Sequence, residues 1–242
     1  MRKAFLLCFS VLLAGSILAQ TDSTAPKSNP LDRFQPRSND HFMLQLGYLS
    51  WVDIPDTINT SGLPRTFNAY FLFDFPFKTN PKMSAAIGVG FATDHMFFDK
   101  TYVGIKDQTQ SVVFQDLSDT TRFKKYKLST AYLEAPVELR FSSKPDDNKK
   151  SIKAAIGVKV GTLLSATVKG KNLEDKNGNS LNSYTSKEKS KKFFNQNRLS
   201  ATARLGYGHF SIFGSYAITP LFKEGLGPQV RPMTIGLTLS GL

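Results

Sequence analysis

Cysteine and histidine are scarce in this sequence. Its 242 residues include one cysteine and three histidines. A single thiol can build neither a disulfide framework nor a thiolate zinc site. We therefore predict no metal-ligating residues and no cofactor-binding residues.

Long apolar runs are also missing. Beyond the N-terminus no stretch of 18 or more apolar residues occurs, which excludes a helical membrane protein. The apolar fraction of 40% nevertheless excludes a disordered chain. The length suits one or two ordinary domains, and a single all-β domain can use all of it.

The N-terminus has the features of a secretory signal. Arg2 and Lys3 form a basic start, and the apolar stretch 4–18 is too short to span a membrane with its flanks. Small residues then allow cleavage after Ala19 or Gln20. We predict a signal peptide over 1–19 and hence an exported protein.

Residues 20–40 are polar and rich in proline, which predicts a loosely ordered periplasmic tail. From His41 onward, segments of about ten residues alternate in hydrophobicity and are separated by turn signals, as β-strands do. In 151–168 the even positions are aliphatic and the odd positions are small or cationic. Eight such segments run near 41–52, 65–75, 82–93, 127–141, 151–168, 197–207, 210–219 and 230–241.

The face opposite the large apolar residues distinguishes a membrane barrel from a soluble sandwich. On 82–93 that face reads Ser, Ala, Gly, Gly, Ala, which suits a narrow lumen better than a water-facing surface. The connections also alternate between long and short, as in outer-membrane barrels with long external loops and short periplasmic turns. In order they are 53–64, 76–81, 94–126, 142–150, 169–196, 208–209 and 220–229.

These patterns predict an all-β fold over 41–242: an eight-stranded antiparallel up-and-down transmembrane β-barrel. The alternative is an exported soluble barrel that binds an apolar ligand. In that case the aliphatic faces would point inward, and Phe71 and Phe73 would line a pocket.

Charged side chains on the inward faces predict a buried ion-pair network that fills the lumen. A buried unpaired charge costs several kcal/mol, so we expect these groups to pair rather than line a channel. The turn at 142–150 suggests a register with Glu134 opposite Lys159 and Arg140 opposite Lys153. The alternative is a narrow pore. The predicted network comprises Glu134, Glu138, Arg140, Lys153, Lys159 and Arg204, with Tyr132 and Arg198 also facing inward.

No catalytic residues are predicted, because the histidines do not converge. His41 and His209 lie at the periplasmic rim, and His95 lies at the opposite end beside Asp94. An Asp-His pair without an assigned nucleophile is better interpreted as a solvated strand end.

The segment 169–195 holds seven lysines. It lacks the aromatic platform of a nucleic-acid site, so nucleic acid is not an expected partner. We interpret it as a solvated loop, with lipopolysaccharide phosphates as the alternative contact. Asp175, Asn177 and Asn179 imitate the start of a calcium loop, but Ser180 stands where glycine is required. Asn177-Gly178 instead predicts a hairpin tip.

Three segments resemble a known family. YLEAPVELRF at 132–141, AAIGVKVG at 154–161 and MTIGLTLSGL at 233–242 are similar to the PorT-type outer-membrane β-barrel proteins of Bacteroidetes. The resemblance implies an outer-membrane location and, for the member that names the family, a part in type IX protein secretion. We expect a non-enzymatic structural or accessory component of an envelope process, in contact with outer-membrane lipid, lipopolysaccharide and other secretion or envelope proteins.

Overall fold

The structure is a computed structural model that describes residues 41–145 and 147–241. The predicted signal peptide (1–19) and polar tail (20–40) lie outside these residues.

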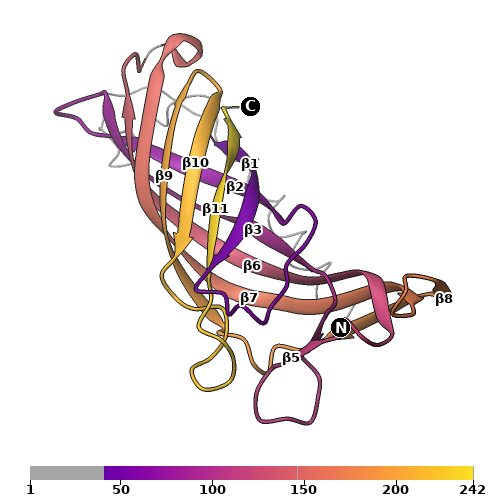
Figure 1. Ribbon diagram of the computed structural model, residues 1–242. Coiled ribbons are helices and arrows are strands. Elements are labelled where there is room, and N and C mark those ends of the chain that lie inside the picture. Colours follow the sequence, from indigo (N-terminus) through magenta and orange to yellow (C-terminus); the bar gives the residue numbers. More distant parts are fainter. Residues whose placement is uncertain (1–40, 146, 242) are drawn as a thin grey trace, which may run out of the picture. The chain divides into compact units, whose positions relative to one another are not determined.

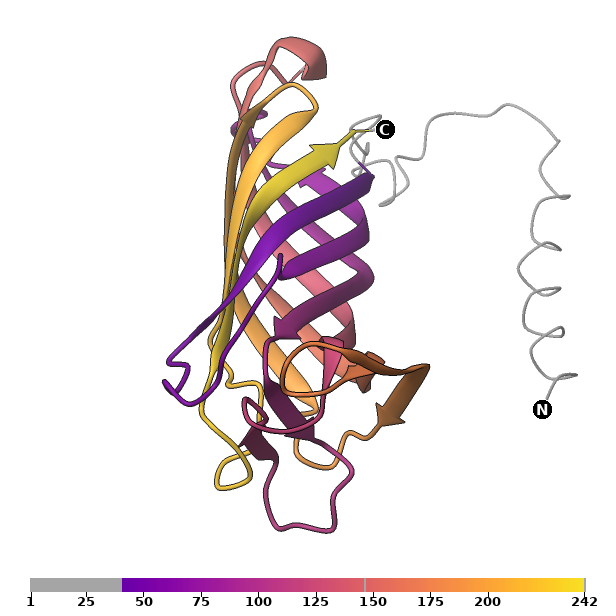
Figure 2. The same cartoon turned by 45° about the vertical axis from the view of Figure 1, so that its right-hand side comes forward.

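Eight antiparallel strands hydrogen-bond into a closed ring (Figures 1 and 2). The ring runs β1-β2-β3-β6-β7-β9-β10-β11, and β11 pairs back onto β1 to close it. The predicted barrel is therefore confirmed. The ring strands are β1 (Phe42–Val52), β2 (Arg65–Pro76), β3 (Met83–Phe98), β6 (Arg122–Ser142), β7 (Ile152–Glu174), β9 (Asn197–Tyr207), β10 (Phe210–Ala217) and β11 (Arg231–Ser240).

The inside and outside faces of the ring follow the predicted alternation. On β7, Ile156 is 65% exposed and Lys159 is 5% exposed. Phe71 and Phe73 on β2 are 44% and 50% exposed, because they belong to the outer apolar face. The soluble alternative, in which these two rings line an inner pocket, is therefore wrong.

Glycines on the inward faces let neighbouring side chains cover the backbone. A Cβ on Gly90 would lie 2.1 Å from the Ala69 carbonyl oxygen and 2.5 Å from the Tyr70 ring. A Cβ on Gly157 would lie 2.2 Å from the Val137 carbonyl oxygen. Neighbouring side chains and backbone thus occupy the space that a side chain at these glycine positions would need. This close packing fills the narrow lumen of an eight-stranded barrel.

At the long-loop end the strands run further than predicted. β3 continues to Phe98, β6 begins at Arg122 and β7 continues to Glu174. The predicted loops 94–126 and 169–196 are therefore partly strand. They also contain three short strands outside the ring: β4 (Thr101–Gly104), β5 (Val113–Asp116) and β8 (Ser180–Lys189).

A bulge in β7 explains why the alternation of the sequence predicted the wrong faces at the long-loop end of this strand. Tyr132 pairs with Leu163 but Ala131 pairs with Ser165, so β7 holds one extra residue there. Since side chains alternate, the extra residue reverses the faces beyond it. Ala166 and Val168, predicted on the aliphatic outer face, are buried inside instead.

Two turns are as predicted. Tyr207 pairs with Phe210 across the two-residue hairpin 208–209. The β7–β8 hairpin turns at Gly178, whose φ is +87°. Asp175 Oδ1 accepts from the backbone N–H groups of Asn177 and Asn179 at 2.8 Å. Hydrogen bonds from the side chain and backbone of Asn179 lower the pKa of Asp175. The carboxylate therefore stabilises the hairpin turn.

Within 41–145 and 147–241, no helix has the length and hydropathy needed to cross a bilayer.

Candidate functional site: a closed lumen

Glu134 on β6 is the centre of a buried network that crosses the lumen. The Arg198 guanidinium on β9 donates to Glu134 Oε1 through Nε at 3.0 Å and through Nη2. The same guanidinium donates to Asp94 Oδ2 on β3. Thr66 on β2 donates its hydroxyl to Asp94 Oδ1 at 2.6 Å. Four strands are thereby joined across the interior.

Aromatic rings surround the charges of this network. The Tyr70 hydroxyl donates to Glu134 Oε2. The Arg198 Cζ atom lies 3.7 Å from the centroid of the Tyr132 ring, a cation–π contact. Lys159 Nζ lies 3.9 Å from Glu134 Oε2. Glu134 therefore balances two cations, and tyrosines replace the water that these charges lose.

A second cluster lies nearer the short turns. Glu138 Oε2 accepts from Arg140 Nε and from Arg204 Nη2, each at 2.9 Å. Arg140 Nη1 lies 3.6 Å from Asp74 Oδ1, which also accepts from the Ser84 hydroxyl at 2.7 Å. Ion pairing offsets the desolvation of these charges.

All six side chains of the predicted network are buried. Glu134 and Lys159 lie in the first cluster, and three others lie in the second cluster around Glu138. Lys153 is 7% exposed at the short-turn end of β7. The structure thus places five of the six predicted residues in two clusters, and Lys153 lies beyond them.

The predicted register between β6 and β7 is wrong by two residues. Glu134 pairs with Gly161, and Arg140 pairs with Ala155. The connection 143–151, which contains the 3₁₀ turn η2 (Asn148–Lys150), has the predicted length of nine residues but lies one residue further along the chain, and this moves the pairing by two residues. The predicted opposition of two cations therefore does not occur, and the lysine that contacts Glu134 reaches it diagonally.

Sequence reasoning missed three ionisable members of these clusters: Tyr70, Asp74 and Asp94. All three are buried on inward faces. The prediction that Asp94 is a solvated strand end is wrong, because β3 extends past it and the Arg198 guanidinium covers it. The even positions of 65–75 carried a signal for Tyr70 and Asp74, because Thr66 and Asn68 share that face. Asp94 continues the face of small residues in 82–93.

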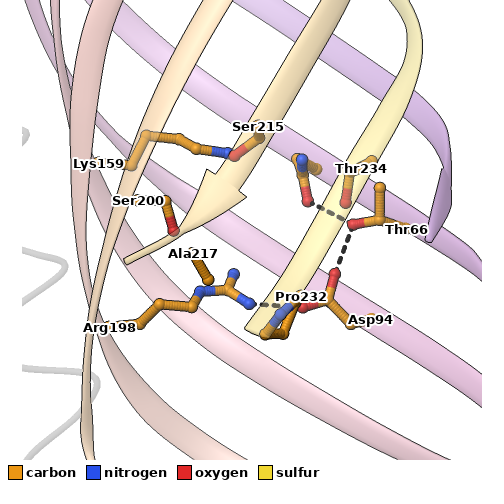
Figure 3. Close-up of a pocket in the computed structure, with 10 residues that line it drawn as sticks. Thr66, Asp94, Lys159, Arg198, Ser200, Ser215, Ala217, Pro232 and Thr234 are labelled. Atoms are coloured by element: carbon orange, nitrogen blue, oxygen red, sulfur yellow. Dashed lines mark hydrogen bonds and ion pairs between the residues drawn. The ribbon is translucent and has the colours of Figure 1, made fainter. Parts of the chain in front are cut away.

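One small polar cavity remains beside the first cluster. Its volume is about 20 Å³, and Figure 3 shows Lys159 and Arg198 extending from one wall towards Thr66 and Asp94 on the other. Such a volume holds about one water molecule. The lumen at this level is therefore filled by side chains.

A second closure, absent from the sequence prediction, lies at the long-loop end. Apolar side chains from all four long connections pack onto inward residues of the strands in one core, which we call the apolar cap. From the connections come Ile58, Val103, Ile105, Val112, Phe193, Phe194, Leu221, Phe222 and Val230, and from the ring come Leu49, Trp51, Ala92, Met96, Phe98, Tyr126, Leu128, Tyr132, Leu163, Ala166 and Val168.

Phe222 is at the centre of the cap. Its ring centroid lies 5.0 Å from that of Phe194, 5.9 Å from that of Phe114 and 6.3 Å from that of Trp51. A cavity of only about 10 Å³ lies between cap residues such as Trp51 and Asp94 of the polar network, and Tyr132 belongs to both the cap and the network. The interpretation of 169–195 as a solvated loop is therefore wrong for Phe193 and Phe194, which are fully buried in the cap. The aromatic pair 193–194 inside a lysine-rich stretch was the available signal.

Tyr102 lies at the edge of the cap, in β4. Its hydroxyl donates to Asp107 Oδ1 at 3.1 Å, and its ring stacks on Tyr126. Partial burial, together with Asp107, raises the pKa of Tyr102 to about 12. A cavity of about 190 Å³ adjoins these two rings.

The histidines do not form a catalytic group with Asp94. His95 faces outward, where Nδ1 lies 2.8 Å from the Ser129 hydroxyl, whereas Asp94 faces the lumen. Adjacent residues of a strand point to opposite faces, which separates the pair. Among the described residues, no group of three His, Cys, Asp or Glu side chains stands close enough to hold a metal.

Residues 44–223 match the family described as outer membrane protein beta-barrel domain. Two solved structures of Ail, the attachment invasion locus protein of Yersinia pestis, align with this chain. One, in complex with the heparin analogue sucrose octasulfate, is 15% identical with a TM-score of 0.35, and the other is 13% identical with a TM-score of 0.33. Each alignment covers 84% of this chain and 97% of Ail. Among curated proteins, none matches the sequence.

Proposed function

Since the chain belongs to the outer membrane protein beta-barrel domain family, we propose that it is a closed, non-conducting barrel that serves as a non-enzymatic structural or accessory component of the envelope. The observation that carries this proposal is the double closure of the lumen. The Glu134 network fills the middle of the ring, and the apolar cap covers its long-loop end.

The two closures oppose ion flow for different reasons. A permeating ion would have to separate Glu134 from Arg198, which leaves buried charges unpaired at a cost of several kcal/mol. It would then have to enter an apolar core that offers no replacement for its hydration shell. Either closure alone is sufficient to prevent ion conductance through the barrel.

The test is conductance of the reconstituted full chain in planar bilayers. We expect no steady current from the wild type, from Glu134→Gln or from Phe222→Ala, because each single variant leaves one closure in place. Heat-modifiable mobility in gels verifies that each preparation is folded. Steady single-channel currents with an ion selectivity that changes in Glu134→Gln would make this protein a narrow pore instead.

A closed barrel has to act through its surfaces. We infer that this one contributes to an envelope process such as type IX protein secretion, and the support is its resemblance to PorT-type barrels at 132–141, 154–161 and 233–242. The partners would then be other secretion or envelope proteins.

Affinity isolation of the intact protein from native outer membrane tests this role. We expect secretion components at a constant ratio to the barrel across washes of increasing salt. The matched control is an unrelated outer-membrane barrel isolated with the same tag. Recovery of the same proteins with both barrels, or of lipid alone, would contradict the role in secretion.

A further inference from the structure

Three lysines stand side by side on the outer face of the barrel at its long-loop end. Lys127 on β6 pairs with Lys169 on β7, and Lys169 pairs with Lys187 on β8. Directly paired residues on neighbouring strands point to the same face, about 5 Å apart. The result is a row of three like charges across three strands.

The adjoining rows add further cations to this face. On one side of the central row, Lys125 pairs with Lys171. On the other side of the central row, Lys189 pairs with Thr167. Figure 1 shows β8 alongside the far end of β7, where it widens this face beyond the ring. We call these six residues the lysine ladder: Lys125, Lys127, Lys169, Lys171, Lys187 and Lys189.

The paired rows of the ladder, as the structure describes them, contain no carboxylate, unlike the surroundings of two other cations of this protein. In the described strands β6, β7 and β8, no Asp or Glu occupies any of the three rows. By contrast, Lys124 on the opposite face of β6 lies 3.1 Å from Glu174, and Arg231 lies 3.0 Å from Asp53. Like charges placed directly opposite are unfavourable, so the ladder calls for an anion from outside the chain.

The ladder lies just beyond the lipid-facing belt. The outward residues of β7 from Ile152 to Leu164 are apolar except for Thr162, and those from Ser165 to Lys171 are polar. Thirteen residues of a strand tilted by about 40° rise about 30 Å, close to the height of an outer-membrane apolar belt. Lys169 is five residues further along. It therefore stands at the level of the outer-leaflet headgroups.

Side-chain contacts on the neighbouring strands β2, β3 and β6 also support a position at the level of the headgroups. Lys127 Nζ lies 5.7 Å from the centroid of the Phe97 ring, and the Arg65 guanidinium lies 5.4 Å from the same ring. An aromatic ring between cations at the end of an apolar belt is typical of a membrane interface, where rings and long cationic side chains meet headgroups.

We propose that the lysine ladder binds the phosphate groups of an anionic outer-leaflet glycolipid. Phosphate oxygens between the rows would replace repulsion between ammonium groups with charge-assisted hydrogen bonds. The acyl chains of the same lipid would lie along the apolar face of β6 and β7. This inference rests on the membrane location of the barrel, and neither the closed lumen nor a role in secretion enters it.

The test is binding of purified bisphosphorylated lipid A to the full chain in zwitterionic detergent. The variant replaces the central row: Lys127→Gln, Lys169→Gln and Lys187→Gln together. We expect its affinity for lipid A to fall at least 10-fold. Dephosphorylated lipid A should bind the wild type and the variant equally weakly, because only the phosphates distinguish them.

A matched control removes three exposed lysines from the short-turn end: Lys78→Gln, Lys82→Gln and Lys149→Gln together. It changes the net charge by the same amount, and we expect less than a 2-fold change in affinity. Equal losses of affinity for lipid A in both variants would show that only the net charge of the protein matters, and this would overturn the proposed site. Unchanged binding in the ladder variant would overturn it as well.

Thermal unfolding gives a second readout, measured separately from the binding experiment. Without an anionic lipid, the ladder variant should unfold at or above the wild-type midpoint, because repulsion has been removed. Lipid A should raise the midpoint of the wild type by several degrees and leave the variant unchanged. An equal shift from inorganic phosphate would identify a free-anion site, and capture of an acidic protein without lipid would identify a protein site. Either result would contradict the glycolipid.

Discussion

The two halves of the lumen are closed by opposite chemistry. From the middle of the ring towards the short turns, Glu134 and Glu138 pair with cations from other strands. Near the long loops, Phe222 and its neighbours exclude polar groups from a core of loop and strand residues. The first closure links ring strands to one another, whereas the second links the loops to the ring. The same lumen can therefore lose its cap without losing its ring.

Two probes separate these regions. Trp51 is the single tryptophan of the sequence and lies within the cap, with its ring centroid 5.7 Å from that of Phe98. Its fluorescence reports the packing of the cap. Heat-modifiable mobility in gels reports whether the ring is intact. A change confined to one region should move one probe and leave the other in place.

The largest effect is expected from Glu134→Ala. This change leaves Arg198 and Lys159 without their shared carboxylate and the Tyr70 hydroxyl without its acceptor. Removing one partner of a buried ion pair costs about 3–5 kcal/mol, and we expect about 5 kcal/mol here because two cations lose a partner. The free energy of unfolding, followed by mobility in urea, measures the loss.

Glu224→Ala is the control, since Glu224 is exposed on a long loop and its loss should cost less than about 0.5 kcal/mol. Adding Lys159→Ala to Glu134→Ala should cost less than the sum of the two single changes, because the sites share one interaction. Additive costs would mean that the charges in the lumen do not stabilise one another.

A smaller and more local effect is expected from Phe222→Ala. Truncating a fully buried phenylalanine costs about 3–5 kcal/mol, and we expect about 4 kcal/mol confined to the cap. Trp51 emission should shift to the red, and proteases should cut the connections 99–121 and 218–230 faster. The mobility of the folded ring should stay unchanged.

Leu63→Ala provides the comparison, because Leu63 is 63% exposed in another long connection. It should leave both probes unchanged. Simultaneous loss of the ring and the cap in Phe222→Ala would show that the two regions form one cooperative unit, contrary to the separation proposed here.

The same contrast explains how much of the structure was predictable. Alternation along a strand is local, so it correctly separated Ile156 from Lys159 and placed the ring strands. Parity depends on an unbroken pleat, so one extra residue near Ser165 was enough to reverse the faces beyond it. Register depends on where the turn lies, and a turn centred one residue later along the chain displaced the pairing by two residues.

The cap could not be predicted in this way. Ile58, Val112 and Phe222 belong to different connections and meet only after the ring has closed. The periodicity of the sequence contains no information about such contacts between separate loops. The charged clusters were partly predictable because their residues lie on strands, but the roles of Asp74 and Asp94 required the pairing of strands distant in sequence.

A third prediction tests which face of β7 belongs to the lumen. Ile156→Arg places a cation against lipid near mid-bilayer, where arginine costs about 2–4 kcal/mol, and we expect about 3 kcal/mol. Lys159→Ala on the inward face should change insertion into lipid vesicles much less. Folding yield and unfolding free energy in vesicles measure both. Equal tolerance of the two changes would contradict the assignment of faces.

The smallest expected effect is a pH dependence confined to the cap. The pKa of Tyr102 is raised to about 12, so folding favours the neutral hydroxyl. The resulting stability is present below pH 10, the usual tyrosine value, and is lost as the pH rises towards 12. Because the side chain is only partly buried, screening by water should keep the effect below about 1 kcal/mol.

Tyr102→Phe isolates this contribution, since other tyrosines titrate over the same range. The quantity to measure is the difference between the two proteins in the urea midpoint of Trp51 fluorescence from pH 9 to pH 12. We expect that difference to shrink as the Tyr102 hydroxyl ionises in the unfolded chain and then in the cap. The ring mobility should show no matching change, because Tyr102 contacts Asp107 and Tyr126 at the loop end. A constant difference across this range would mean that the hydroxyl does not contribute to holding the cap closed.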